Sequence, residues 1–151
     1  MDFRVASLQG FLIDHCPTCR VPGYLVITPA ARIPSLAELP PGDRRGLGQV
    51  LGWAAEAIRL TIAPVRLHCL PFAEAGGPPR VHLFPRTRQV THGFLGAFPG
   101  RQDLLRRPLV MHWARAHYRA PAHEVWELAG PLIPALREAL LLVAGAQAPL
   151  P

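Results

Sequence analysis

The sequence lacks lysine and asparagine and has only two serines. Without lysine the chain cannot form a phosphate-binding loop of the G-x-x-x-x-G-K-[ST] type or a Schiff base with a carbonyl substrate or pyridoxal phosphate. Without asparagine it has no N-x-[ST] glycosylation site. Ser7 and Ser35 have no identifiable histidine and acid partners, so a serine hydrolase triad has no support. These absences exclude several common classes of enzyme.

Cysteines and long apolar runs are also scarce. The chain has three cysteines in 151 residues, and an odd number does not build a disulfide framework. Arg137 and Glu138 interrupt the apolar C-terminal part, so no run reaches the ~18 to 20 apolar residues that a membrane helix needs. The apolar stretch 5–13 contains Gln9 and has no small-residue cleavage site. We therefore expect a cytoplasmic protein without membrane contacts.

What the sequence does contain is arginine and apolar residues. Half of the residues are hydrophobic and 17% are charged, which is typical of a globular protein, and the length predicts one domain over residues 1–151. All basic residues are arginines, and the net charge is +6. Guanidinium groups bind phosphate and carboxylate oxygens, which favours an anionic partner. Arginine in place of every lysine is also typical of a compositionally biased genome, and both interpretations stay open.

The pattern of residues predicts strands in the first half and helices in the last third. Four short runs rich in β-formers are predicted strands, and the first two and the last two form antiparallel pairs: 11–14, 24–28, 65–70 and 80–84. Apolar residues recur at helical spacing over 47–62, and Pro64 ends this helix. A helical extension over about 100–145 has three predicted segments: 103–117, 121–128 and 132–144. The fold class is therefore α+β.

Several short motifs occur in a fixed order between Cys16 and Arg86. They are Cys16-Pro17-Thr18-Cys19, then LVITP at 25–29, RIPSLAEL at 32–39 and RVHLFPR at 80–86. Together they resemble the C-P-x-C, L-V-I-P-K, H-x-x-S-L-x-D-L and H-x-H-x-H-x-x-P-R motifs of the histidine triad (HIT) superfamily of nucleotide hydrolases and transferases. The resemblance covers residues 16–86. It implies a twisted antiparallel sheet of about five strands with flanking helices, commonly assembled as a homodimer.

The resemblance assigns the three triad positions to particular residues. Aligned on Pro85-Arg86, His82 takes the place of the third histidine, Arg80 of the second and Pro78 of the first. In the family the second histidine attacks the α-phosphate, but arginine stays protonated and has no lone pair to attack phosphorus. Arg80 and His82 should line one face of a strand ~6 to 7 Å apart, a displacement that keeps His82 from in-line attack. We expect nucleotidyl transfer to be lost or severely weakened.

Binding fits these residues better than catalysis. Arg80 would place a fixed positive charge where the resemblance puts a phosphate, and His82 could donate to a phosphate oxygen. Arg86 and Arg32 would add positive potential. We therefore predict a diverged HIT-like protein that binds a nucleotide or another phosphorylated ligand. The alternatives are a strand histidine bonded within the fold for His82, and a solvated arginine for Arg80.

Two other functions stay open. One is an active HIT-type hydrolase of dinucleoside polyphosphates or nucleoside phosphoramidates, with His82 as the catalytic residue. The other is a protein or nucleic-acid interaction module built on the basic C-terminal third. Its candidate residues are Arg106, Arg107, Arg115 and Arg119.

Cys16 and Cys19 are candidate zinc ligands because C-x-x-C is a common spacing in structural zinc sites. By resemblance, zinc-bearing relatives complete the site with two histidines, at positions that hold Arg32 and Pro78 here. Neither of these residues can bind the metal. Other residues that could complete such a site are His15, His68 and Cys69. We expect reduced, partly buried cysteines and no cofactor, with a zinc site as the alternative.

Overall fold

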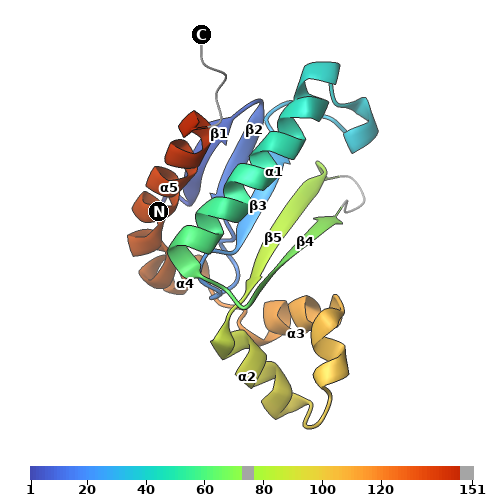
Figure 1. Ribbon diagram of the computed structural model, residues 1–151, viewed down its shortest axis with the longest axis vertical. Coiled ribbons are helices and arrows are strands. Elements are labelled where there is room, and N and C mark those ends of the chain that lie inside the picture. The colour runs from blue at the N-terminus through green and yellow to red at the C-terminus, as the bar shows by residue number, and fades with distance from the viewer. Residues whose placement is uncertain (73–76, 147–151) are drawn as a thin grey trace.

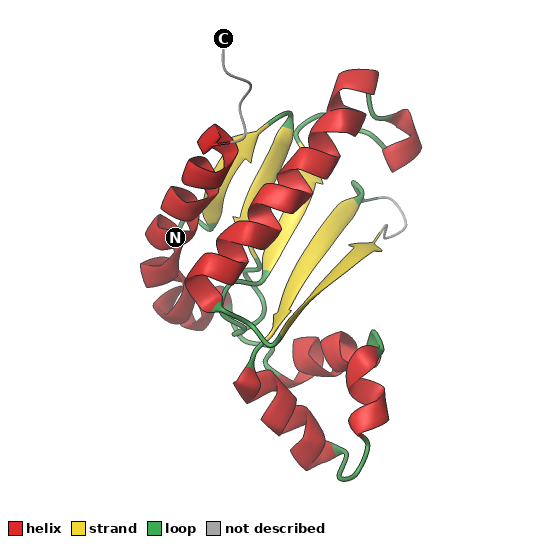
Figure 2. Cartoon of the chain, viewed as in Figure 1, coloured by secondary structure: helices red, strands yellow, loops and turns green. Residues whose placement is uncertain are grey.

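The computed structural model describes residues 1–72 and 77–146. Its strands form one antiparallel sheet in the order β1-β2-β3-β5-β4 (Figure 2). The strands are β1 (Arg4–Leu8), β2 (Phe11–His15), β3 (Leu25–Pro29), β4 (Arg66–Phe72) and β5 (Arg80–Arg86). The predicted α+β class and the five-stranded sheet are confirmed.

Both predicted strand pairs are present. β2 pairs with β3, with Ile13 opposite Ile27, and β4 pairs with β5, with Leu70 opposite His82. The turn predicted between β4 and β5 lies partly outside the described residues. β5 also pairs with β3, where Val26 lies opposite His82. His82 therefore lies in the interior of the sheet, with a strand on each side.

Strand β1 was not predicted, because residues 5–13 form one apolar stretch in the sequence with no clear turn signal. The chain instead turns at Gln9 and Gly10, which have φ angles of 50° and 80°. Two consecutive residues with positive φ make the type of two-residue turn that joins antiparallel strands. Gln9 is not a typical residue for this position, so the turn signal was weak.

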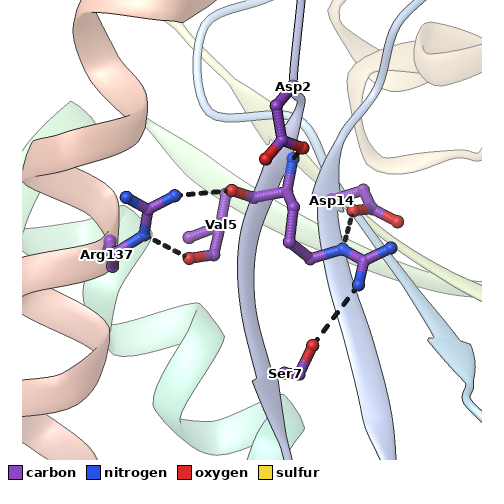
Figure 3. Close-up of polar contacts among 6 residues, drawn as sticks. Asp2, Val5, Ser7, Asp14 and Arg137 are labelled. Carbon is purple, nitrogen blue, oxygen red and sulfur yellow. Dashed lines mark hydrogen bonds and ion pairs between the residues drawn. The ribbon is translucent and has the colours of Figure 1, made fainter.

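Three polar contacts hold β1 in place (Figure 3). Arg137 of α5 donates from Nε to the Val5 carbonyl and from Nη2 to the Arg4 carbonyl, both at 2.8 Å. The Arg4 guanidinium also forms an ion pair with Asp14 of β2. The edge of the sheet is thus tied both to its neighbouring strand and to the last helix.

The predicted long helix is α1 (Pro41–Ile62), which begins six residues earlier than the apolar pattern indicated. Pro41 is suited to the first turn of a helix because that turn has no partner for its N–H group. Ala63, which has left-handed backbone angles, caps the end of the helix just before Pro64. A short 3-10 helix, η1 (Leu36–Glu38), precedes it.

The remaining helices follow β5. They are α2 (Arg88–Ala97), η2 (Gln102–Arg106), α3 (Leu109–His117), α4 (Ala122–Ala129), η3 (Gly130–Leu132) and α5 (Ile133–Ala146). Helix α2 was not predicted, although Thr87 caps it by accepting a hydrogen bond from Val90 N at 3.2 Å. The predicted segment 103–117 is divided into η2 and α3, with Pro108 at the junction.

The sheet carries a separate core on each face. Val81 and Leu83 of β5 belong to the first core, which α1 and α5 cover. Tyr24 and Phe84 belong to the second core, with side chains of α2 and α3. Figure 1 shows α1 across one face of the sheet and α2 and α3 beyond the ends of β4 and β5. Alternation along β5 therefore directs every second side chain toward the α2–α3 side.

One described stretch, Ala122–Gly145, is long and apolar enough to span a membrane by length and composition, with 28% of its window buried. It comprises α4, η3 and most of α5, with Pro131 in η3 and Pro134 in the first turn of α5. Leu136 and Leu140 of α5 are fully buried in the first core. Its apolar composition is therefore accounted for in part by packing against the sheet and α1.

Candidate functional site

Arg80 and His82 lie on the same face of β5, as the alternation of a strand requires. The residue between them, Val81, points into the first core. Arg80 begins the strand and is exposed, whereas only 6% of His82 is exposed. The two predicted residues share a face but differ in depth. Arg80 meets solvent, and His82 belongs to the interior.

His82 is held by Tyr24, which precedes β3. The Tyr24 hydroxyl oxygen lies 2.8 Å from His82 Nδ1, and the two ring centroids are 5.7 Å apart. Burial raises the pKa of Tyr24, so the hydroxyl keeps its proton. When that hydroxyl donates to Nδ1, the histidine carries its own proton on Nε2.

The surroundings of His82 also set its charge. Burial, and then the positive charges of Arg115 and Arg80, lower the pKa of His82 to about 4. The ring is therefore neutral at neutral pH. Arg115 belongs to α3, so a charge from the C-terminal third acts on a residue of the motif strand.

Arg86, the second basic candidate on β5, lies six residues from Arg80, about 20 Å along the strand. It is 8% exposed, and its Nη1 donates to Thr91 Oγ1 at 3.4 Å. Among the described residues no hydrogen-bond partner is found for its Nε. Burial, with Arg66 nearby, lowers the pKa of Arg86. The structure therefore does not bring Arg86 to Arg80.

Arg32 lies in the exposed connection between β3 and η1. Because β3 and β5 are antiparallel, with Ile27 opposite Val81, the end of β3 lies beside the start of β5. Arg32 therefore follows the same end of the sheet at which Arg80 is exposed. Of the two additional arginines, only Arg32 is placed at that end.

Cys16 and Cys19 are both buried and free. Cys19 Sγ lies 3.8 Å from the Ala114 carbonyl oxygen, and Cys16 Sγ lies 3.6 Å from Thr18 Oγ1. Burial raises the pKa of the Cys19 thiol to about 12. Both thiols therefore have protein partners and lie within the second core.

Both ring nitrogens of His15, the residue before Cys16, also have partners within the protein. His15 Nδ1 lies 3.0 Å from the Cys16 carbonyl oxygen, and its Nε2 accepts a hydrogen bond from Gly23 N at 3.2 Å. Over residues 1–72 and 77–146, no group of three or more His, Cys, Asp or Glu side chains could hold a metal ion. The described residues do not fit a zinc ion.

Sequence reasoning missed two residues of the site, Tyr24 and Arg115. Tyr24 lies 58 residues before His82, and no motif joins them. The sequence indicates Arg115 only as part of the basic C-terminal third. The repeat of apolar residues in α3 around it could have indicated which of its neighbours face inward.

No protein-family model matches the sequence, and no curated protein matches it. The fold is similar to a zinc-bound histidine triad family protein from Mycobacterium smegmatis, with 17% identity, a TM-score of 0.58 and coverage of 97% of this chain and 89% of that one. It is also similar to a hypothetical histidine triad nucleotide-binding protein from Sulfolobus tokodaii strain 7, with 15% identity, a TM-score of 0.60 and coverage of 95% and 86%. A third likeness is to a Hit-like protein involved in cell-cycle regulation from Bartonella henselae, with 15% identity, a TM-score of 0.50 and coverage of 58% and 72%.

The chain therefore has the histidine triad fold. The resemblance drawn from the motifs over residues 16–86 is confirmed at the level of the fold, and the similarity extends well beyond those residues. The zinc of the Mycobacterium protein has no matching group of ligands in the part of this chain that the structure describes.

Proposed function

We propose that the protein binds a nucleotide or another phosphorylated ligand at the exposed start of β5, without transferring the nucleotidyl group. The observation that supports this proposal most directly is the exposed guanidinium of Arg80, on a strand whose fold is shared with histidine triad proteins. One of these relatives is described as a nucleotide-binding protein. Arginine offers five N–H donors in a planar arrangement that matches phosphate oxygens.

The position of His82 argues against catalysis by this residue. A nucleophile has to approach phosphorus within roughly 3 to 3.5 Å in a held geometry. His82 is almost completely buried, and the Tyr24 hydroxyl occupies one of its ring nitrogens. Its neutral state at neutral pH does not compensate for this lack of access.

Calorimetric titration with AMP and GMP tests the binding proposal. Arg80→Gln should weaken binding about tenfold or more, since a charge-assisted hydrogen bond contributes about 1.5 to 3 kcal/mol. Arg45→Gln is the matched control, because it removes the same charge from an exposed position on α1. An absence of binding at millimolar nucleotide, or equal weakening by both variants, would contradict the proposal.

The second candidate function is hydrolysis of dinucleoside polyphosphates or nucleoside phosphoramidates. It is favoured by one observation, the neutral imidazole that His82 retains on the same face as Arg80. The test is release of mononucleotide above background by the wild type and its loss in His82→Ala. This result would establish hydrolysis and refute the proposal that the protein binds without catalysis. We expect no such release.

We also propose that the chain is a single cytoplasmic domain that forms a homodimer. Leu60 of α1 and Val65 before β4 are large apolar side chains with half or more of their surface exposed. They lie near a groove of about 350 Å³ whose lining residues come from α1, Pro64 and β4. Light scattering should give twice the chain mass, and Val65→Glu should shift the protein toward the monomer.

A further inference from the structure

A second concave surface lies between the β2–β3 connection and α3. It has a volume of about 390 Å³, within the ~300 to 1,000 Å³ range of small-molecule sites. Its lining residues are Thr18, Cys19, His112, Arg115, Ala116 and Arg119. We call this surface the α3 pocket. Arg80 does not line it, so the argument below does not depend on the function proposed for β5.

Backbone contacts fix the two walls of the α3 pocket relative to each other. Cys19 and Arg119 form an antiparallel bridge. On either side of it, Arg20 N donates to the Tyr118 carbonyl at 2.9 Å and Ala120 N donates to the Thr18 carbonyl at 3.2 Å. The pocket is therefore pre-organised, which lowers the entropic cost of binding.

The lining is basic. Arg115 of α3 and Arg119, two residues after the end of α3, both line the pocket, so their like charges repel each other. None of the described residues that line the pocket is acidic. The nearby acid Glu124 already forms an ion pair with Arg20 at 3.3 Å. An anion in the pocket would offset this repulsion.

The positive charge of Arg115 also acts on buried groups next to the pocket. Arg115 acts electrostatically on three buried groups: Cys19, Tyr24 and His82. Arginine is a strong ligand for oxyanions because its planar fork donates two parallel hydrogen bonds. The Thr18 hydroxyl adds a neutral donor from the opposite wall.

We propose that the α3 pocket binds a compact dianion, specifically the phosphate group of a small phosphate monoester. Two guanidinium groups match the two negative charges of such a phosphate, whereas a carboxylate would neutralise only one of them. The remaining volume accommodates a small organic group attached to the phosphate.

Calorimetric titration with inorganic phosphate and glycerol phosphate, at constant ionic strength, tests the α3 pocket. The wild type should bind phosphate saturably, and acetate should not compete. Arg119→Gln should weaken phosphate binding about tenfold or more, and Thr18→Val should weaken it less, in line with charged and neutral hydrogen bonds. Both side chains are exposed, so the variants should keep the wild-type circular dichroism and Tm.

Two controls separate this inference from the function proposed for β5. Arg45→Gln removes an exposed arginine far along the sequence, and Arg80→Gln removes the arginine of β5. Arg45→Gln should leave phosphate affinity unchanged, and in the Arg80→Gln background Arg119→Gln should still weaken phosphate binding about tenfold or more. The inference is overturned by an absence of saturable binding at millimolar phosphate, by unchanged affinity in Arg119→Gln, or by equal weakening in Arg45→Gln. If Arg80→Gln weakens phosphate binding and Arg119→Gln does not, the phosphate binds on β5. That result would support the proposed function and refute phosphate binding in the α3 pocket.

Discussion

Acidification should destabilise this protein through His82. In the unfolded chain the imidazole binds a proton near its ordinary pKa of about 6.5. In the folded protein, burial and the charges of Arg115 and Arg80 lower the pKa of His82 to about 4. The unfolded state therefore binds more protons between these two values. Stability is undiminished above the higher pKa and falls as the pH falls toward the lower one.

The size of the effect follows from the separation of the two pKa values. At 1.36 kcal/mol for each pH unit, the loss reaches about 3 kcal/mol at about pH 4. At about pH 5 the loss is about 2 kcal/mol. Burial also lowers the pKa of His15 and of His68, which adds losses of the same sign. The contribution of His82 therefore has to be isolated by substitution.

Urea unfolding of the wild type and His82→Gln provides the comparison. The glutamine amide retains a hydrogen-bonding group near Tyr24 but does not titrate. Between about pH 8 and about pH 5 the free energy of unfolding should fall by about 2 kcal/mol more in the wild type than in the variant. His123→Gln, at an exposed position of α4, controls for the removal of one imidazole. Equal losses in wild type and His82→Gln, or an NMR titration of His82 near its ordinary pKa, would refute the reasoning.

Three substitutions test the backbone and the sheet edge by thermal and urea unfolding. Ala63→Gly should raise stability by about 1 kcal/mol and the Tm by about 2 to 4 °C, because Ala63 has a φ of 47°. Gly23→Ala should cost more than about 2 kcal/mol, since Gly23 has a φ of 73° and an added Cβ would lie 2.5 Å from Ile62 Cγ1. Arg137→Met should cost about 1 to 2 kcal/mol and speed amide exchange in β1, because two carbonyls lose their donors. No change in stability in any of the three would contradict the corresponding contact.

The predicted elements differ from the observed ones where local signals were weak. The pair β2–β3 and the helix α1 were predicted because Pro22-Gly23, Pro64 and the helical apolar spacing are strong local signals. Strand β1 was missed because Gln9 in its turn is atypical. Helix α2 contains Gly93 and Gly96, which lower helical propensity, so only its Thr87 cap marked it.

The residues of the candidate site were also predicted only where a local pattern connects them. Strand alternation predicts that Arg80 and His82 share a face, and the structure agrees. The motif placed Arg86 in the same group, but the length of β5 separates it from Arg80. Tyr24 and Arg115 were not connected to His82 by any pattern, because tertiary packing brings them together.

The sequence by itself determined the strand pairs β2–β3 and β4–β5, the long helix α1 and the arginine at position 80, whose side chain has no lone pair to attack phosphorus. These properties depend on the chemistry of single residues and on neighbours a few positions away. Only the tertiary structure decided that His82 is buried and neutral, that Cys16 and Cys19 are buried without a group of metal ligands among the described residues, and that the β2–β3 connection and α3 enclose a basic pocket. The physical reason is that burial and electrostatic potential at a residue are produced by segments distant in the chain, and a sequence pattern does not report their distances.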